Sequence, residues 1–311
     1  MIGSAFGVLF DGFAYGMLLF LLSVGLSVTL GMMNFVNLAH CSFAMLGGYV
    51  TVTLTMGLDC NIPPLQILGW TFPGLHLFTI PPLPFLMTLP FAFLSAALAS
   101  VVFERVLYRR LYRATDLDQC LLTIGIVFMS VAAAAYIYGT IQQPVNLPAY
   151  LRGTVAVMGQ SLGVYRLFLI GMALIVTLVL VLALEYTRFG AQVRAAVDNQ
   201  RMARGLGINV DAAFAITFAL GSGLAGLGGA LGADILPVHW GYPLEHLVYF
   251  LIVVAVGGLG SLRGPFVAAL LIGIADTACK YWIPEFGAFL VYAATIGILL
   301  WRPMGLFGTR A

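Results

Sequence analysis

The sequence predicts an all-α polytopic membrane protein, a helix bundle with about eight to ten transmembrane segments. Of its 311 residues, 61% are hydrophobic and 8% are charged, whereas soluble domains carry about 25% charged residues. Long uncharged runs recur along the chain, and a run of 18 or more apolar residues is typical of a membrane span. The runs are continuously apolar rather than alternating, which argues against a membrane β-barrel.

Nine apolar runs give the expected spans, most of them near the 20 residues that a helix needs to cross ~30 Å of hydrocarbon. They cover residues 11–33, 41–57, 83–104, 120–141, 166–186, 211–236, 246–262, 264–282 and 286–302. The apolar stretch 61–82 contains five prolines, and proline breaks helices. We therefore expect this stretch to form an outside loop or a short re-entrant piece, and the whole chain 1–311 to form a single transmembrane domain.

The arginines predict how the bundle is oriented. Ten of the fourteen basic residues lie in three places: Arg105, Arg109, Arg110 and Arg113; Arg188, Arg194, Arg201 and Arg204; and Arg302 and Arg310. The positive-inside rule places all three on the cytoplasmic side. The C-terminus is then cytoplasmic, the loops 57–82, 142–165 and 237–245 face outside, and nine spans put the N-terminus outside.

Several kinds of chemistry are missing from the sequence. It has no G-x-x-x-x-G-K-[ST] motif, so the chain has no P-loop nucleotide site. The four cysteines are scattered and the four histidines are spread over three regions, which predicts neither a metal site nor a disulfide framework. Basic residues are few and flank the spans, so nucleic acid is not an expected partner. We expect a non-enzymatic protein without a cofactor, either a transport component or a membrane scaffold.

A polar cluster interrupts the apolar sequence between residues 31 and 50. Asn34, Asn37 and His40 are spaced three apart, which places them on one face if the segment is helical. Transport proteins use such interrupted helices to bind a polar solute near the middle of the membrane. The alternative is a set of interhelical hydrogen bonds. The residues that we expect to line a substrate path are Asn34, Asn37, His40, Cys41, Ser42 and Gly47.

A second interruption lies in the other half of the chain, at residues 254–273. Paired Gly- and Pro-interrupted segments indicate a transporter built from two pseudo-symmetric halves with helices broken near mid-membrane. A tight cytoplasmic turn between two helices explains the same residues equally well. The candidate hinge residues are Gly257, Gly258, Gly260, Arg263, Gly264 and Pro265.

The basic loop 188–210 is predicted to contain one short amphipathic helix. Residues 191–204 hold strong helix formers and no glycine or proline, and Gly205 and Gly207 then end the helix. Such a helix either lies in the lipid headgroups or docks in the groove of a cytoplasmic partner. The residues in question are Val193, Arg194, Ala195, Ala196, Val197, Asp198, Met202, Arg204, Gly205 and Gly207.

Two further patterns lie within the predicted spans. Small residues recur every four positions through 219–233, which permits close helix packing. Asp276 lies four residues before Lys280, the single lysine, so the two side chains can pair on one helix face. An ionisable group inside a span is a functional candidate, and proton coupling through Asp276 would make the chain a secondary transporter.

Five segments, taken in order, resemble one family, the LivH-type permeases of ABC importers for branched-chain amino acids and related solutes. They are MNFVNLAHCSFAMLGGYV (33–50), FERVLYRRL (103–111), VRAAVDNQRMARGLGINV (193–210), AVGGLGSLRGP (255–265) and RPMGLFG (302–308). The resemblance runs from about residue 13 to residue 308.

The resemblance implies a set of partners and a mechanism. The chain would be one permease of a heterodimer with a LivM-like second permease in the bacterial inner membrane. Two cytoplasmic ABC ATPases would drive it, and a periplasmic solute-binding protein would deliver the solute. The loop 188–210 would carry the coupling helix, seated in an ATPase groove.

Two features depart from the family pattern. Cys41 follows His40 where the family usually has glycine, and the outer loop 57–82 is longer and richer in proline. Both lie where solute or binding protein would be sensed. Urea, short amides, and aromatic or aliphatic carboxylates therefore stay open as alternative solutes.

Overall fold

A computed structural model describes residues 2–33, 35–62, 65–67, 70–72, 75–112, 114–157, 160–258 and 263–308. The helices are α1 Ile2–Met33, α2 His40–Met56, α3 Phe85–Phe103, the π-helix η1 Glu104–Tyr108, α4 Arg109–Leu111, α5 Asp116–Tyr138, η2 Ala149–Leu151, α6 Val164–Glu185, α7 Arg188–Asp198, α8 Gln200–Gly205, α9 Val210–Gly232, α10 Tyr242–Gly257, α11 Arg263–Trp282, η3 Pro284–Phe286 and α12 Gly287–Trp301. The strands are β1 Leu58–Ile62, β2 Leu65–Ile67, β3 Trp70–Phe72, β4 Leu75–Ile80, β5 Thr154–Val157 and β6 Gln160–Gly163. The predicted all-α polytopic bundle is confirmed.

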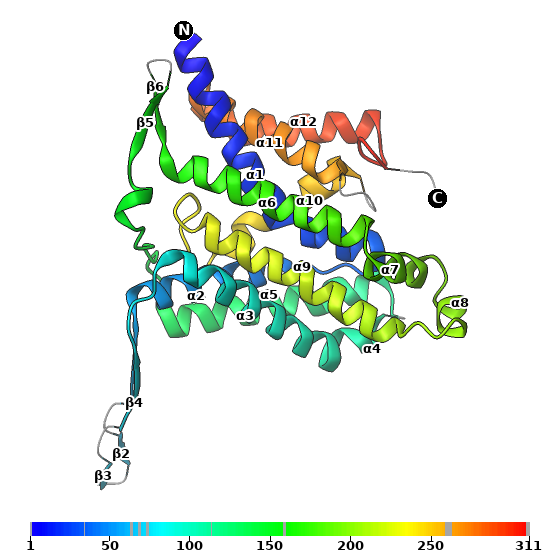
Figure 1. Ribbon diagram of the computed structural model, residues 1–311, viewed down its shortest axis with the longest axis horizontal. Coiled ribbons are helices and arrows are strands. Elements are labelled where there is room, and N and C mark those ends of the chain that lie inside the picture. The colour runs from blue at the N-terminus through cyan, green and yellow to red at the C-terminus, as the bar shows by residue number, and fades with distance from the viewer. Residues whose placement is uncertain are drawn as a thin grey trace.

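Helices α1 and α9 form the centre of the bundle (Figure 1). In the apolar window of α1, 83% of the residues are buried, against 22% in that of α6. The small residues of α9 explain this packing, because a Cβ at Gly229 would collide with the carbonyl of Ala44 in α2, and Gly221 faces Gly25 in α1. The predicted close-packing role of the 219–233 repeat is confirmed.

Five helices among the described residues are long and apolar enough to cross a membrane: Ala5–Gly31, Phe85–Leu111, Asp116–Tyr138, Val164–Glu185 and Val210–Gly232. The other four predicted spans coincide with α2, α10, α11 and α12, which are shorter or carry more charge. Each predicted span thus corresponds to a helix, with ends shifted by a few residues. The exception is α1, which begins nine residues before the predicted position because its first turns are equally free of helix breakers.

The described residues between 57 and 80 form strands, where a loop or a short re-entrant piece was expected. β1 pairs with β4 and β2 pairs with β3, both antiparallel. β5 and β6 form a second hairpin before α6. The prolines Pro81 and Pro82 follow β4 directly, which agrees with the prediction that proline keeps this stretch from forming a helix.

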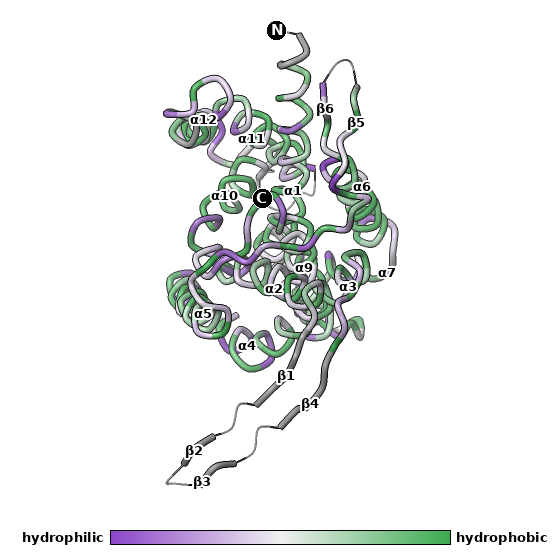
Figure 2. Tube along the Cα trace, turned by 90° about the vertical axis from the view of Figure 1, so that its left-hand side faces the viewer, coloured by the Kyte–Doolittle hydropathy of each residue, from purple (hydrophilic) through white to green (hydrophobic). Residues whose placement is uncertain are grey.

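The two ends of the bundle differ in charge. α4, α7, α8 and the C-terminal segment lie at one end, which we call the basic end, and the β5–β6 hairpin and the start of α1 lie at the other, which we call the hairpin end (Figure 1). Figure 2 shows hydrophobic colour along most of the helices between them. The described residues of the predicted arginine clusters therefore gather at one end, with the chain starting at the opposite end.

Candidate functional site

Helix α2 begins in the middle of the bundle. Its first residue, His40, has its Nε2 atom 3.1 Å from the carbonyl oxygen of Leu22 in α1. Leu22 lies eleven residues before the end of α1 at Met33, which corresponds to about 16 Å along the helix axis. Residues 35–39 form a non-helical segment that leads from the end of α1 to this depth. The predicted helix interruption near mid-membrane is therefore present at this position.

The predicted helical face of Asn34, Asn37 and His40 is wrong. Asn37 lies in the non-helical segment before α2, and Asn34 lies outside the described residues. The helix starts only at His40, where it has no side-chain N-cap. In this non-helical segment Phe35 packs against Tyr108, Tyr112 and Phe218, contacts between residues far apart in the sequence.

The start of α2 leaves several buried polar atoms without a hydrogen-bond partner in the described part of the chain. They are Nδ2 and Oδ1 of Asn37, Nδ1 of His40, and Oγ of Ser222 on α9. Because the Leu22 carbonyl only accepts, the His40 Nε2–H donates to it, which leaves Nδ1 as the unused acceptor. Each unsatisfied buried group costs about 1–3 kcal/mol. Native proteins keep few such groups, and those they keep call for an explanation.

The other predicted path residues are also buried in this state. Cys41 is fully buried, and Ser42 shares a hydrogen bond of 2.7 Å between hydroxyl oxygens with Ser130 of α5. Gly47 faces α9, where a Cβ would collide with the Gly226 carbonyl. The structure brings Asn37, His40 and Gly47 to the contact between α2 and its neighbours α1 and α9. Their role as a substrate path stays a prediction.

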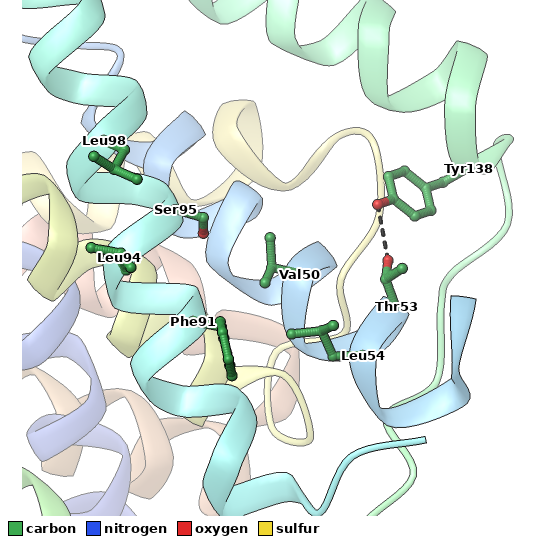
Figure 3. Close-up of a pocket in the computed structure, with 8 residues that line it drawn as sticks. All are labelled: Val50, Thr53, Leu54, Phe91, Leu94, Ser95, Leu98 and Tyr138. Carbon is green, nitrogen blue, oxygen red and sulfur yellow. Dashed lines mark hydrogen bonds between the residues drawn. The ribbon is translucent and has the colours of Figure 1, made fainter. Parts of the chain in front are cut away.

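Farther along α2, the helix borders an open apolar groove of about 350 Å³. Its walls are Val50, Thr53 and Leu54 from α2, Phe91, Leu94, Ser95 and Leu98 from α3, and Tyr138 at the end of α5 (Figure 3). The Thr53 hydroxyl and the Tyr138 hydroxyl lie 3.0 Å apart across its edge. An aliphatic lining with a few hydroxyls is suited to a small amphipathic solute.

Sequence reasoning missed Gln119, which supports the non-helical segment. Its Oε1 accepts a hydrogen bond of 3.0 Å from the Val36 backbone N–H, and its Nε2 donates to the Leu111 carbonyl at 3.2 Å. Gln119 is 3% exposed and lies in the first turn of α5. The Thr115–Asp118 capping box marks the start of this helix in the sequence, but nothing local indicates a partner 83 residues away.

The basic loop forms two helices, so the prediction of one helix through 191–204 is wrong. The break is at Asn199, which has extended backbone and whose Oδ1 accepts from the Met202 N–H at 3.0 Å, capping α8. Asparagine favours such caps over helix interiors. α8 ends at Gly205, and Gly207 has a positive φ of 81°, so the predicted glycine stop is confirmed.

The two helices divide their apolar residues between two faces. Val193 and Ala196 are buried against the bundle, and Val197 is half-buried beside them. The sequence predicts Met202 on the same stripe, but its side chain is 64% exposed, because the break at Asn199 rotates α8. Leu206 is also exposed, at 79%. Among the other residues of this loop, Ala195 is half-buried. The exposed ones are Arg194, Asp198, Arg201, Arg204, Gly205 and Gly207.

An ion-pair cluster holds α8 against the rest of the basic end. Asp211, in the first turn of α9, pairs with Arg109 of α4 and with Arg204 of α8, the latter at 2.9 Å. All three side chains are about half exposed. Displacement of α8 is thus linked to both α9 and α4.

The second interruption lies at the basic end, between α10, which ends at Gly257, and α11, which starts at Arg263. Gly258 has a positive φ of 92°, and Arg263, Gly264 and Pro265 form the first turn of α11. The C-terminal segment packs on the end of α10 through hydrogen bonds from Leu306 N to Val256 O and from Phe307 N to Gly257 O. The hinge role of these residues stays a prediction. Gly260 lies outside the described residues.

Asp276 and Lys280 form the predicted pair on α11, with 2.6 Å between Nζ and Oδ2. The carboxylate is 1% exposed and the lysine side chain is 56% exposed. A buried carboxylate that has its own cation is adequately explained as a paired group. A proton-coupling role therefore has no support in this geometry.

The fold and the site define a polytopic α-helical membrane protein in which one helix begins deep in the bundle and a two-helix element projects at the basic end. Residues 8–299 match the family model of the branched-chain amino acid transport system / permease component. The chain belongs to this family of permeases.

Named relatives agree with the family match over nearly the whole chain. The high-affinity branched-chain amino acid transport system permease protein LivH of Escherichia coli K12 is 26% identical, covering 96% of this chain and 94% of the relative. BraD of Pseudomonas aeruginosa is 24% identical with the same coverage. A probable LivH of Methanocaldococcus jannaschii is 28% identical over 94% of this chain and 90% of its own.

No solved structure gives a significant match. The family and its named members favour neither the urea, amide and carboxylate alternatives nor a proton-coupled carrier.

Proposed function

We propose that this chain forms part of the translocation path of an ABC importer for branched-chain amino acids, and that the path follows α2. The observation that carries this proposal is the start of α2 at mid-bundle, where both amide atoms of Asn37 and the Nδ1 atom of His40 are buried without a hydrogen-bond partner among the described residues. Such groups are costly in one closed state. They are explained if a second state exposes them to water or solute between α2 and its neighbours.

The open apolar groove farther along α2 would supply the apolar part of such a path. Thr53 and Tyr138 offer hydroxyls, and Val50, Leu54 and Phe91 offer aliphatic and aromatic contacts. A branched aliphatic side chain has complementary chemistry. The relatives named for branched-chain amino acids make this solute class the one to test first.

The driving force is proposed to enter through α7 and α8. The chain has no P-loop motif, so ATP would be hydrolysed by two partner ATPases at the cytoplasmic face. The exposed Met202 and Leu206 would seat in the ATPase surface, and Val193 and Ala196 would fix α7 to the bundle. By the positive-inside rule, this end and the C-terminus would lie on the cytoplasmic side of a bacterial inner membrane. A second permease and a periplasmic binding protein complete the assembly.

Uptake by the assembled transporter tests the proposal. Proteoliposomes that contain this chain, a second permease, the ATPases and the binding protein should accumulate labelled leucine only with ATP. The double variant Asn37→Ala and His40→Ala should lose uptake while the complex still assembles. Uphill uptake by the chain alone, or full uptake by the double variant, would refute it.

Cross-linking tests the coupling surface separately. A photo-reactive residue at Leu206 should capture an ATPase subunit. The same residue at Leu300, which is 81% exposed on α12, should capture lipid. Capture of lipid alone at Leu206 would show that α8 lies on the membrane instead.

A further inference from the structure

The hairpin end holds a small cavity lined by four ionisable side chains. It measures about 210 Å³ and lies between α1, α6, α11 and the turn after α9. Asp11, Arg166, Asp276 and Lys280 contribute to its walls. Only 8% of the residues of this chain are charged, so four charged groups around one cavity are a marked concentration. None of them belongs to the path along α2 or to the coupling surface.

The four groups form two opposite ion pairs that face the same space. Arg166 of α6 pairs with Asp11 of α1, and Lys280 pairs with Asp276 at 2.6 Å. Asp276 also accepts a long hydrogen bond of 3.5 Å from the Tyr249 hydroxyl. Arg166 and Lys280 remain 42% and 56% exposed. A guanidinium has five donors, an ammonium three and a carboxylate about four lone pairs, so each pair keeps capacity for a further ligand.

The rest of the wall is apolar or weakly polar. Ile235 and Leu236 come from the turn after α9, and Tyr15 comes from α1. The Lys280 ammonium lies 5.6 Å from the centre of the Tyr15 ring. A cavity of this size is below the ~300 Å³ of pockets for drug-sized ligands. It therefore fits a small solute that has both charges and an aliphatic part.

A second cavity, of about 490 Å³, shares Arg166 and Ile235 in its wall and reaches Arg152 and Asp234. Burial raises the pKa of Asp234, while Arg166 and Arg152 oppose this change. Arg166 therefore lines both cavities and acts electrostatically on Asp11 in the first and on Asp234 in the second.

We propose that this cavity binds the zwitterionic head of an aliphatic α-amino acid at the outer end of the permease. The carboxylate would bind to Arg166 and Lys280, and the ammonium to Asp11, which at 34% is the more exposed of the two carboxylates. The aliphatic side chain would contact Ile235 and Leu236. Two cations and two anions give the wall no net charge, so a lone anion gains contacts with the cations but also approaches the carboxylates, and a lone cation the reverse, whereas a zwitterion meets groups of both signs. The choice of an amino acid rests on the proposed function.

The test is equilibrium binding of labelled L-leucine to the assembled transporter, without binding protein and without ATP. Unlabelled L-leucine and L-valine should displace the label, whereas 4-methylpentanoate and isoamylamine, which each carry one of the two charges, should not. Loss of one hydrogen bond to a charged group corresponds to about a tenfold to hundredfold weaker affinity, and this is expected for Arg166→Gln. Arg110→Gln, at the basic end, should bind leucine as the unchanged protein does.

A second variant guards against misfolding. Thr277→Phe fills the cavity but leaves both ion pairs intact, and it should also abolish saturable binding in a complex that assembles normally. Unchanged binding in both variants, absent saturable binding, or equal displacement by the two single-charge analogues would overturn the inference.

Uptake separates this inference from the proposed function. If the transporter takes up leucine with ATP but does not bind it at this cavity, the proposed binding site is wrong and the proposed transport function is supported. Saturable leucine binding lost in Arg166→Gln, together with no leucine uptake, would remove the function and leave the cavity as an amino acid site.

Discussion

His40 donates a hydrogen bond of 3.1 Å to the backbone carbonyl of Leu22, at a level where α1 is still helical for another eleven residues. The imidazole fits there because α1 has Gly25, whose missing side chain leaves room for both the His40 ring and Gly221 of α9. This contact fixes the depth at which α2 begins. It also joins α1 and α2 through a polar side chain and a backbone atom deep in the bundle.

The unused amide of Asn37 gives the first prediction. Replacing a buried, unpaired polar group with an apolar one of similar size removes a penalty of about 1–3 kcal/mol. Asn37→Leu should therefore leave the melting temperature of the complex unchanged or raised, while ATP-dependent leucine uptake falls at least tenfold. Thermal unfolding and uptake measured on the same preparation check both parts. Stability gained with full uptake retained would mean that Asn37 has no transport role.

Close contact between α2 and α9 gives the second prediction. Gly47→Ala places a Cβ against the Gly226 carbonyl, and overpacking of this kind costs about 1–3 kcal/mol. Gly171→Ala in α6 is the matched control, because nothing lies within 4 Å of its Cβ position and alanine favours a helix by about 1 kcal/mol over glycine. Thermal melting should shift down for the first variant and stay level or rise for the second. Equal shifts would contradict the packing assignment.

The sequence predicted the helices well because each depends on a local signal. A continuous apolar run is sufficient to place α5 or α6, and the small-residue repeat of 219–233 is sufficient to predict a crowded α9. Prolines kept 61–82 from being predicted as a helix. These features act over a few residues, so tertiary contacts shift only their ends.

The parts that were wrong depend on contacts between distant residues. The predicted helical face of Asn37 and His40 required a helix where the chain instead forms a non-helical segment whose Phe35 packs against Tyr108 and Tyr112. Asn199 splits the basic loop by capping α8 in preference to continuing α7. Gln119 contacts Val36 across 83 residues, and no local pattern indicates such a pairing. The position of the helix interruption was therefore predictable from the sequence, whereas its geometry was not.

Gln119 gives the third prediction. Gln119→Met keeps the length of the side chain but leaves the Val36 N–H without its acceptor, which costs about 1–3 kcal/mol for a buried donor. Gln143→Met is the control, since that side chain is less buried and its amide donates to the Tyr138 carbonyl near the end of α5. Denaturation midpoints should fall for the first variant by clearly more than for the second. Similar small changes in both would show that the non-helical segment is held without Gln119.

The exposed apolar tip of α8 gives the fourth prediction. Met202 is 64% exposed and Leu206 is 79% exposed, and a charge at Met202 would have to be desolvated wherever α8 is seated in a partner. Met202→Glu should therefore lower uptake and the ATPase stimulation by loaded binding protein by at least tenfold, because burying an unpaired carboxylate costs several kcal/mol. Leu117→Gln is the matched control at the same end, 68% exposed in the first turn of α5 and remote from α8 in the chain. It should leave both rates within about twofold, since exposed surface substitutions change free energies by about 0.5 kcal/mol or less. Normal stimulation by the Met202→Glu transporter would place the ATPase contact elsewhere on the basic end, whereas loss of stimulation in both variants would indicate a general defect of that end.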